Sequence, residues 1–187
     1  MHASLSGKLL VAMPGIGDPR FERSVIMMCV HTPEQAMGLI VNKPKEDLTL
    51  GEVLEHLGLD VDAAVAAHGV LDGGPVQPER GYVLHSEDFE APDATRPVCA
   101  GVRLTATREV LAAIASGTGE PKDAVLALGC SGWGAGQLEH ELAQNAWLVA
   151  EPDAAIVFGD GHDGKWLRAI QSIGIDPASL SGQAGRA

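Results

Sequence analysis

The chain has 187 residues, with 13 Lys plus Arg against 25 Asp plus Glu and a formal net charge of −12. Hydrophobic residues make up 45% of it, which excludes a disordered chain and is enough for one domain with a buried core. The acidic balance argues against binding to nucleic acid or to anionic membranes, because both need clustered Lys and Arg. We therefore expect a single domain over residues 1–187.

Cysteine and histidine usage bears on location and on metal binding. Cys29, Cys99 and Cys130 form no C-x-x-C pair, and the seven histidines show no ligand spacing. The sequence therefore predicts reduced thiols, no metal and no cofactor. The apolar run at residues 9–13 is shorter than a signal-peptide core, and no segment is long enough to span a membrane. A cytoplasmic location follows as an expectation.

The first half of the chain predicts two neighbouring strands and a helix. Residues 24–31 are apolar at nearly every position, as in a strand buried on both faces, and residues 37–42 predict its neighbour. Thr49 and Glu52 form a capping box ahead of apolar residues spaced i, i+3, i+4 and i+7. We expect a helix that begins after Thr49 and ends at Gly58.

The second half mixes strands with helices. Residues 81–86 alternate, which places Tyr82 and His85 on opposite faces of a strand. We expect an exposed loop over 87–97, strands over 98–106, 124–129 and 154–159, and helices over 107–116, 136–147 and 166–173. Because this order has no βαβ rhythm, it favours one α+β domain around a mixed sheet.

The stretch GCSGWGAGQLEHELAQNAW, residues 129–147, comes close to three known templates and completes none. A nucleophile elbow requires glycine where Trp133 stands, and a dinucleotide-binding turn requires it where Gln137 stands. A phosphate-binding P-loop requires a lysine that is missing. The pattern predicts a strand that meets a glycine turn and then a helix, with Glu139 bordering the packed side and Glu141 facing solvent.

Two further features have a functional and a structural interpretation. Gly73 and Gly74 in DGGPV can form a nest of backbone N–H groups for an anion, near Arg80, but a turn that requires glycine is favoured. His31 ends a buried strand on the same face as Cys29, and a histidine satisfied by the backbone is favoured there.

Four blocks of sequence stand in the order and spacing of a known family. They are LLVAMPGIGDPRFERSVIMMCVH, AMGLIVNKP, LDGGPVQPERGYVLHS and GCSGWGAGQLEHELAQNAW. Over nearly its whole length the chain resembles the AlgH/YqgE family of bacterial proteins. The resemblance implies an α+β fold whose mixed sheet is partly rolled into an open barrel and surrounded by helices. Members are labelled as transcriptional regulators, after a genetic link to alginate control, but no catalytic residues and no cofactor come with the resemblance.

The family motifs supply most of the candidate contacts for a small ligand or a protein partner. Those contacts are Asp18, Ser24, His31, Asn42, Gly73, Gly74, His85, Trp133, Gly134, Gln137 and Glu139, with Arg80 and Ser131 added from the same blocks. Asp18 precedes Pro19 and is expected to organise the turn there. For Trp133, packing in the core is favoured over exposure as a contact residue.

Three functions remain open from the sequence. The favoured one is a non-enzymatic cytoplasmic regulatory or binding protein, with an unidentified small ligand or protein as partner and a homodimer as one arrangement. The alternative is a small-molecule hydrolase, which requires at least two of Ser24, His31, His85 and Glu139 to meet in a pocket. Direct DNA binding is disfavoured by the net charge of −12.

Overall fold

The computed structural model describes residues 3–180, in which ten strands form one sheet. The strands are β1 (Leu9–Ala12), β2 (Val25–His31), β3 (Gln35–Ile40), β4 (Pro44–Thr49), β5 (Gly69–Asp72), β6 (Val76–His85), β7 (Thr95–Cys99), β8 (Val102–Thr105), β9 (Ala124–Gly134) and β10 (Trp147–Ala150). They lie in the order β10-β1-β2-β3-β9-β6-β8-β7, and β5 joins the edge strand β4 to β9. The pair β5–β9 is parallel whereas pairs such as β1–β2 and β6–β9 are antiparallel, so the sheet is mixed as predicted.

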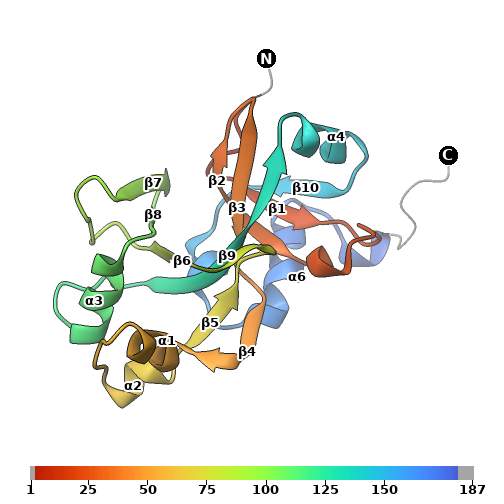
Figure 1. Cartoon of the computed structure of the whole chain (residues 1–187). Coiled ribbons are helices and arrows are strands. Elements are labelled where there is room, and N and C mark those ends of the chain that lie inside the picture. The colour runs from red at the N-terminus through yellow and green to blue at the C-terminus, as the bar shows by residue number, and fades with distance from the viewer. Residues whose placement is uncertain (1–2, 181–187) are drawn as a thin grey trace.

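Helices surround this curled, half-open barrel. They are α1 (Leu50–His56), α2 (Ala63–Ala66), α3 (Arg108–Ser116), α4 (Gln137–Ala143), α5 (Ala154–Phe158) and α6 (His162–Ser172), with 3-10 turns at Pro19–Phe21 and Pro177–Ser179. Figure 1 shows α1, α2 and α3 gathered at one end of the long strand β9 and α4 at the other end. The predicted α+β class is confirmed.

The central strands are buried on both faces, as predicted for residues 24–31. Leu9 of β1 and Met27 of β2 belong to one core, together with Trp166 of α6. Their neighbours Leu10 and Met28 point the other way, into a second core covered by α4. This alternation follows from the period of two along a strand and explains the unbroken apolar run.

A third core lies between α1, α3 and the strands β5, β6 and β9. The predicted capping box of α1 is present: Thr49 N–H donates to the Glu52 carboxylate at 2.7 Å, and Glu52 N–H donates to Thr49 Oγ1 at 3.3 Å. Along β6, Tyr82 joins the first core and Val83 the third, so the predicted alternation of that strand is also confirmed.

Two expected elements are wrong. Residues 154–159 were expected to form a strand but form helix α5, which begins after Asp153, whose carboxylate accepts a hydrogen bond from Ala155 N–H. A short apolar run fits either element, so its period cannot decide between them. Residues 98–106 form two strands instead of one, because the chain reverses at Gly101, whose φ is +80°. The first of these strands starts at Thr95, inside the predicted loop.

The glycine-rich stretch also differs from expectation. Strand β9 continues past Gly129 to Gly134. The turn between this strand and α4 therefore lies at the end of the glycine-rich stretch, where Gly136 precedes α4 with a φ of +71°. Pairing with β3, in the register Gly38 to Ser131, holds this part of β9 extended. Helix α4 ends at Ala143 instead of continuing to residue 147, which begins β10.

Candidate functional site

The two glycine blocks of the sequence meet each other, backbone against backbone. A Cβ atom on Gly73 would lie 2.3 Å from the carbonyl oxygen of Gly129, and a Cβ on Gly74 would lie 2.3 Å from that of Cys130. The close approach of β9 to the DGGPV turn therefore requires glycine on both sides. Gly73 and Gly74 are buried in this contact.

The polar groups of the DGGPV turn are used within the chain. Gly73 N–H donates to the Leu128 carbonyl at 2.9 Å, and Gly74 N–H donates to the Asp72 carboxylate at 3.2 Å. The buried Ser131 hydroxyl donates to the Gly73 carbonyl at 3.2 Å. Arg80 lies over the ring of Tyr82, with 5.3 Å between the guanidinium carbon and the ring centroid. The turn thus matches the structural interpretation of its glycines.

Three candidates from the first two blocks hold the loop before β2. Asp18 accepts a hydrogen bond from Arg20 N–H at 3.0 Å, which organises the Pro19 turn. The hydroxyl of Ser24, which is fully buried, donates to the Phe21 carbonyl at 2.8 Å. Asn42 bridges the loop to β2: its carbonyl accepts from Val25 N–H at 2.8 Å and its amide donates to the Arg23 carbonyl at 2.8 Å.

His85 is fully buried at the end of a chain of hydrogen bonds. Its Nδ1 lies 2.8 Å from the Ser86 carbonyl, which can only accept, and its Nε2 lies 2.8 Å from Thr105 Oγ1. The Thr105 hydroxyl contacts that of Thr95 at 2.7 Å, and Thr95 accepts from Ala91 N–H at 2.8 Å. A neutral ring satisfies every member of this chain. Burial lowers the pKa of His85, which favours the same neutral form.

His31 faces the side of the sheet opposite to that predicted. The register of β2 against β3 shifts between Met28 and Val30, which marks a β-bulge at Cys29. Cys29 packs against the first core, whereas His31 pairs with Ala36, a residue of the second core. The extra residue of a bulge moves the following side chains to the other face of the strand. No local sequence pattern predicts this bulge.

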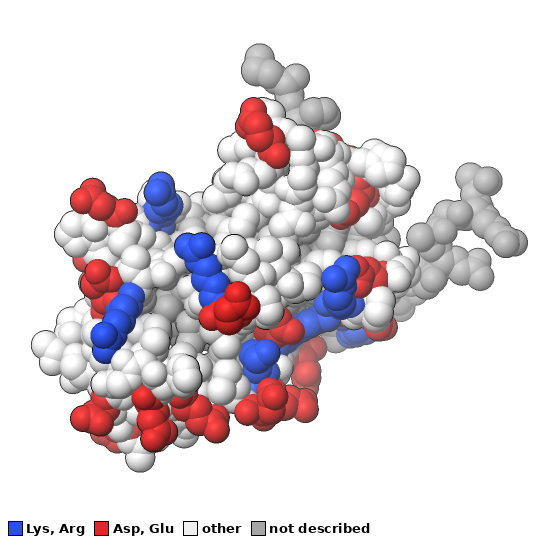
Figure 2. Space-filling model, viewed as in Figure 1, with Lys and Arg blue, Asp and Glu red and all other residues white. Residues whose placement is uncertain are grey.

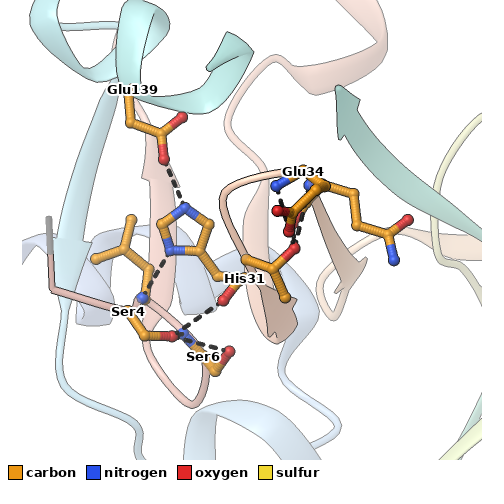
Figure 3. A network of polar contacts seen from close by, with 8 residues as sticks. Ser4, Ser6, His31, Glu34 and Glu139 are labelled. Atoms are coloured by element: carbon orange, nitrogen blue, oxygen red, sulfur yellow. Dashed lines mark hydrogen bonds and ion pairs between the residues drawn. The ribbon is translucent and has the colours of Figure 1, made fainter. Parts of the chain in front are cut away.

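On that face His31 lies beneath α4. Its Nε2 is 2.7 Å from the carboxylate of Glu139, and its Nδ1 accepts a hydrogen bond from Leu5 N–H at 2.9 Å (Figure 3). The imidazole is 7% exposed and the Glu139 side chain 28%. The prediction that Glu139 borders the packed side is confirmed. The pair joins the N-terminal segment, β2 and α4.

A second carboxylate of α4 binds both neighbouring tryptophans. The Nε1–H groups of Trp133 and Trp147 donate to the same oxygen of Glu141, at 2.9 and 2.7 Å. Gln137 donates to the other oxygen at 2.9 Å and accepts from Gly134 N–H at 3.1 Å. Trp133 is 5% exposed, which confirms that it packs in the core. The prediction that Glu141 faces solvent is wrong, because the indole N–H groups draw it inward.

The hydrolase candidates meet only in part. His31 and Glu139 are in contact, but the Ser24 hydroxyl is bonded to a carbonyl and both ring nitrogens of His85 are used elsewhere. Burial raises the pKa of the Cys29 thiol to about 12 and also raises the pKa of Cys99, so neither forms a thiolate readily. The described residues hold no group of three metal-binding side chains.

A groove that the sequence did not indicate opens between α1 and α3. Its volume is about 620 Å³. Its lining residues are Leu48, Glu52, Val53, His56, Leu57, Glu79, Gly81, Val83, Thr105, Ala106, Thr107, Arg108, Leu111, Leu126 and Leu128. The apolar residues of α1 and its C-cap could have indicated this groove, because only some of them pack in the core. Leu50 and Leu54 are buried there, whereas Val53 and Leu57 line the groove.

The chain is similar to known proteins over nearly its whole length. A family model described as AlgH-like matches residues 9–178. The chain belongs to the AlgH-like family. A protein of Caulobacter vibrioides named UPF0301 is 51% identical, over 98% of this chain and 94% of its own. A UPF0301 protein of Bradyrhizobium diazoefficiens is 50% identical, over 98% and 88%.

Solved structures agree with the AlgH-like assignment. The solution structure of AlgH from Pseudomonas aeruginosa superposes with a TM-score of 0.80 at 37% identity, covering 100% of this chain and 98% of that one. A crystal structure from Corynebacterium diphtheriae shares the fold, with a TM-score of 0.74 at 20% identity and coverage of 96% and 91%. No helix among residues 3–180 combines the length and apolar character needed to cross a membrane.

Lys165 is a buried cation that sequence reasoning also missed. It is fully buried in α6, where its Nζ donates to the carbonyls of Val41 and Val157 at 2.7 and 3.3 Å. Burial, reinforced by the nearby Arg168, lowers its pKa from 10.5 to about 8.

This pKa predicts a rise of stability at alkaline pH. A lysine whose pKa is lower in the folded state costs stability while it is charged, and the cost disappears as pH rises from about 8 to about 10.5. Relative to Lys165→Met, the natural chain should gain about 3 kcal/mol of unfolding free energy between pH 7 and pH 10.5. Urea unfolding of both proteins across this range measures the difference, and parallel pH curves would contradict it.

Proposed function

We propose that this chain is a non-enzymatic cytoplasmic regulatory protein that binds a positively charged amphipathic ligand in the groove between α1 and α3. The observation that supports the proposal most is the groove itself. Its volume of about 620 Å³ falls among small-molecule sites, and its lining combines mainly apolar surface with several polar side chains. Val53, Leu111 and Leu128 are placed to contact the apolar part of a ligand.

The charge of the rim favours a cationic group on the ligand. The lining residues include two carboxylates, those of Glu52 and Glu79, and one guanidinium, that of Arg108. Glu52 also caps α1 and Arg108 also donates to the Leu57 carbonyl at 2.9 Å, but both keep their charge, so the carboxylates outnumber the guanidinium. Figure 2 shows acidic side chains crowded at the end of the molecule where α1 and α2 lie, and the net charge is −12. A cation is therefore attracted to this end of the molecule, and an anion is repelled.

A hydrolase has less support. The contact between His31 and Glu139 resembles an oriented base, but Leu5 N–H occupies the remaining ring nitrogen. While the bond to Leu5 is made, Nδ1 has no free lone pair with which to take a proton from a nucleophile. The regulatory role rests on the groove and on the negative charge, which also disfavours direct contact with DNA.

A titration with decylamine, followed by amide chemical shifts, tests the proposal. We expect shifts confined to residues that line the groove, with a Kd of the order of 1 mM for a ligand of this size. Decanoate, which has a similar apolar chain and the opposite charge, should bind at least about fivefold more weakly because of the carboxylates at the rim. Equal binding of both would contradict the cationic preference.

Filling the groove provides a matched control. A Cβ on Gly81 would touch Leu126 Cδ1 at 3.3 Å and Leu128 Cδ2 at 3.8 Å, so Gly81→Leu places its side chain among the lining residues. This variant should weaken decylamine binding at least about tenfold, since the ligand loses its apolar site. Gly69→Leu, built into open space outside the groove, should leave it unchanged. Unaltered binding by Gly81→Leu would place the site elsewhere.

A further inference from the structure

The N-terminal segment, residues 3–7, is fastened to the end of β2 at His31. Leu5 N–H donates to Nδ1 of the imidazole at 2.9 Å, and the Ser4 hydroxyl donates to the His31 carbonyl at 3.3 Å (Figure 3). Further along, Gly7 N–H donates to the Met28 carbonyl at 2.8 Å. Among the described residues, the His31 ring is the one side chain of β2 that accepts a hydrogen bond from this segment.

The hydrogen-bond partners define the protonation state of the ring. A backbone N–H can only donate, so Nδ1 must present its lone pair to Leu5. The ring proton is then on Nε2, where it donates to the Glu139 carboxylate at 2.7 Å. Both bonds are made at once only by the neutral imidazole with its hydrogen on Nε2.

Protonation would affect the two bonds in opposite ways. If Nδ1 takes a proton from solvent, it becomes a donor that points at the Leu5 N–H, which is also a donor. The hydrogen bond between Leu5 and Nδ1 must then open. The bond to Glu139 would become charge-assisted and stronger. We propose that His31 is a proton-operated latch: neutral, it holds the N-terminal segment to β2, and charged, it releases that segment while α4 stays bound through Glu139.

Among the described residues, charged side chains face the latch from two elements. Glu139 comes from α4, and Glu34 lies in the turn after β2 (Figure 3). His140, the next residue of α4, lies 3.0 Å from Gln144, and Lys8 is paired with Glu151 at 2.6 Å. Release would also uncover apolar surface, because Leu5 packs against the second core. The latch therefore couples acidity to an apolar surface near α4.

NMR of the full natural chain tests the latch without any substitution. The ring nitrogen shifts of His31 should report the Nε2–H form at high pH, and one titration midpoint should be shared by the His31 ring and by the Leu5 amide. As the ring becomes charged, hydrogen exchange at residues 4–6 should accelerate at least about tenfold after correction for the intrinsic rate, while α4 amides remain protected. A resting Nδ1–H ring, or a Leu5 amide that stays protected beside a charged ring, overturns the proposal.

Two variants separate the halves of the latch. In His31→Asn the side-chain oxygen can replace Nδ1 as acceptor, so protection of Leu5 should persist and lose its pH dependence. Glu139→Gln keeps an acceptor for Nε2–H but removes the charge that stabilises the imidazolium, so the release midpoint should move to lower pH. A pH-dependent Leu5 amide in His31→Asn would assign the release to another group and overturn the proposal.

Discussion

Gly129→Ala is expected to destabilise the protein by more than about 4 kcal/mol, which is enough to unfold many domains of this size. Two costs add at this position. The φ angle of Gly129 is +74°, which residues with a Cβ rarely adopt, and the added Cβ would lie 2.4 Å from the Gly74 carbonyl oxygen. That oxygen belongs to backbone packed between strands, so it cannot move aside cheaply.

Gly136→Ala is the matched control for this prediction. Its φ angle is +71°, nearly the same, but nothing lies within 4 Å of the Cβ position. It should therefore cost only about 1 kcal/mol, from the backbone conformation alone. Urea unfolding followed by far-UV circular dichroism measures both variants. Similar losses in the two would show that the contact between the glycine blocks contributes nothing to stability.

Glu141→Ala is expected to cost about 3 kcal/mol, because it leaves two buried indole N–H groups without an acceptor. The carboxylate also accepts from Gln137, so the substitution removes three hydrogen bonds at once. Trp133 and Trp147 contact each other edge-to-face, with 6.0 Å between ring centroids, and should rearrange when the carboxylate is lost. The near-ultraviolet circular dichroism of the tryptophans should change together with the unfolding free energy.

The exposed Glu55 offers the comparison. It lies on α1, which has seven residues like α4, and its exposed side chain takes part in no hydrogen bond within residues 3–180. Glu55→Ala should change the unfolding free energy by no more than about 0.5 kcal/mol and should leave the tryptophan signal unaltered. If Glu141→Ala behaves in the same way, the bonds to the indoles are not important for stability.

The same helix shows what sequence reasoning missed and why. At 100° per residue, Glu141 lies about 60° from Leu138, just as Glu139 lies about 60° from Leu142. The two carboxylates therefore flank the apolar face symmetrically. A helix that continued to residue 147 would have its apolar face centred closer to Glu139. The sequence therefore predicted that Glu141 faces solvent. The true end of the helix at Ala143 removes that shift.

Local patterns determined the parts of this fold that depend on near neighbours. The capping box of Thr49 and Glu52, the alternation along β6 and the doubly buried strand β2 each involve residues within a few positions of one another. The motif blocks also identified the family correctly, as the match over residues 9–178 shows. For these features, hydrogen bonding and burial repeat with the period of the element itself.

Only the tertiary structure decided which of the singled-out residues meet. His31 reaches Glu139 across 108 positions because one bulge in β2 turns it to the face that α4 covers. Gly129 contacts Gly74 because β9 crosses the DGGPV turn, and the groove combines residues from two helices and from strands β6 and β9. Such contacts depend on the register of strands far apart in the chain, and a shift of one residue changes every face that follows.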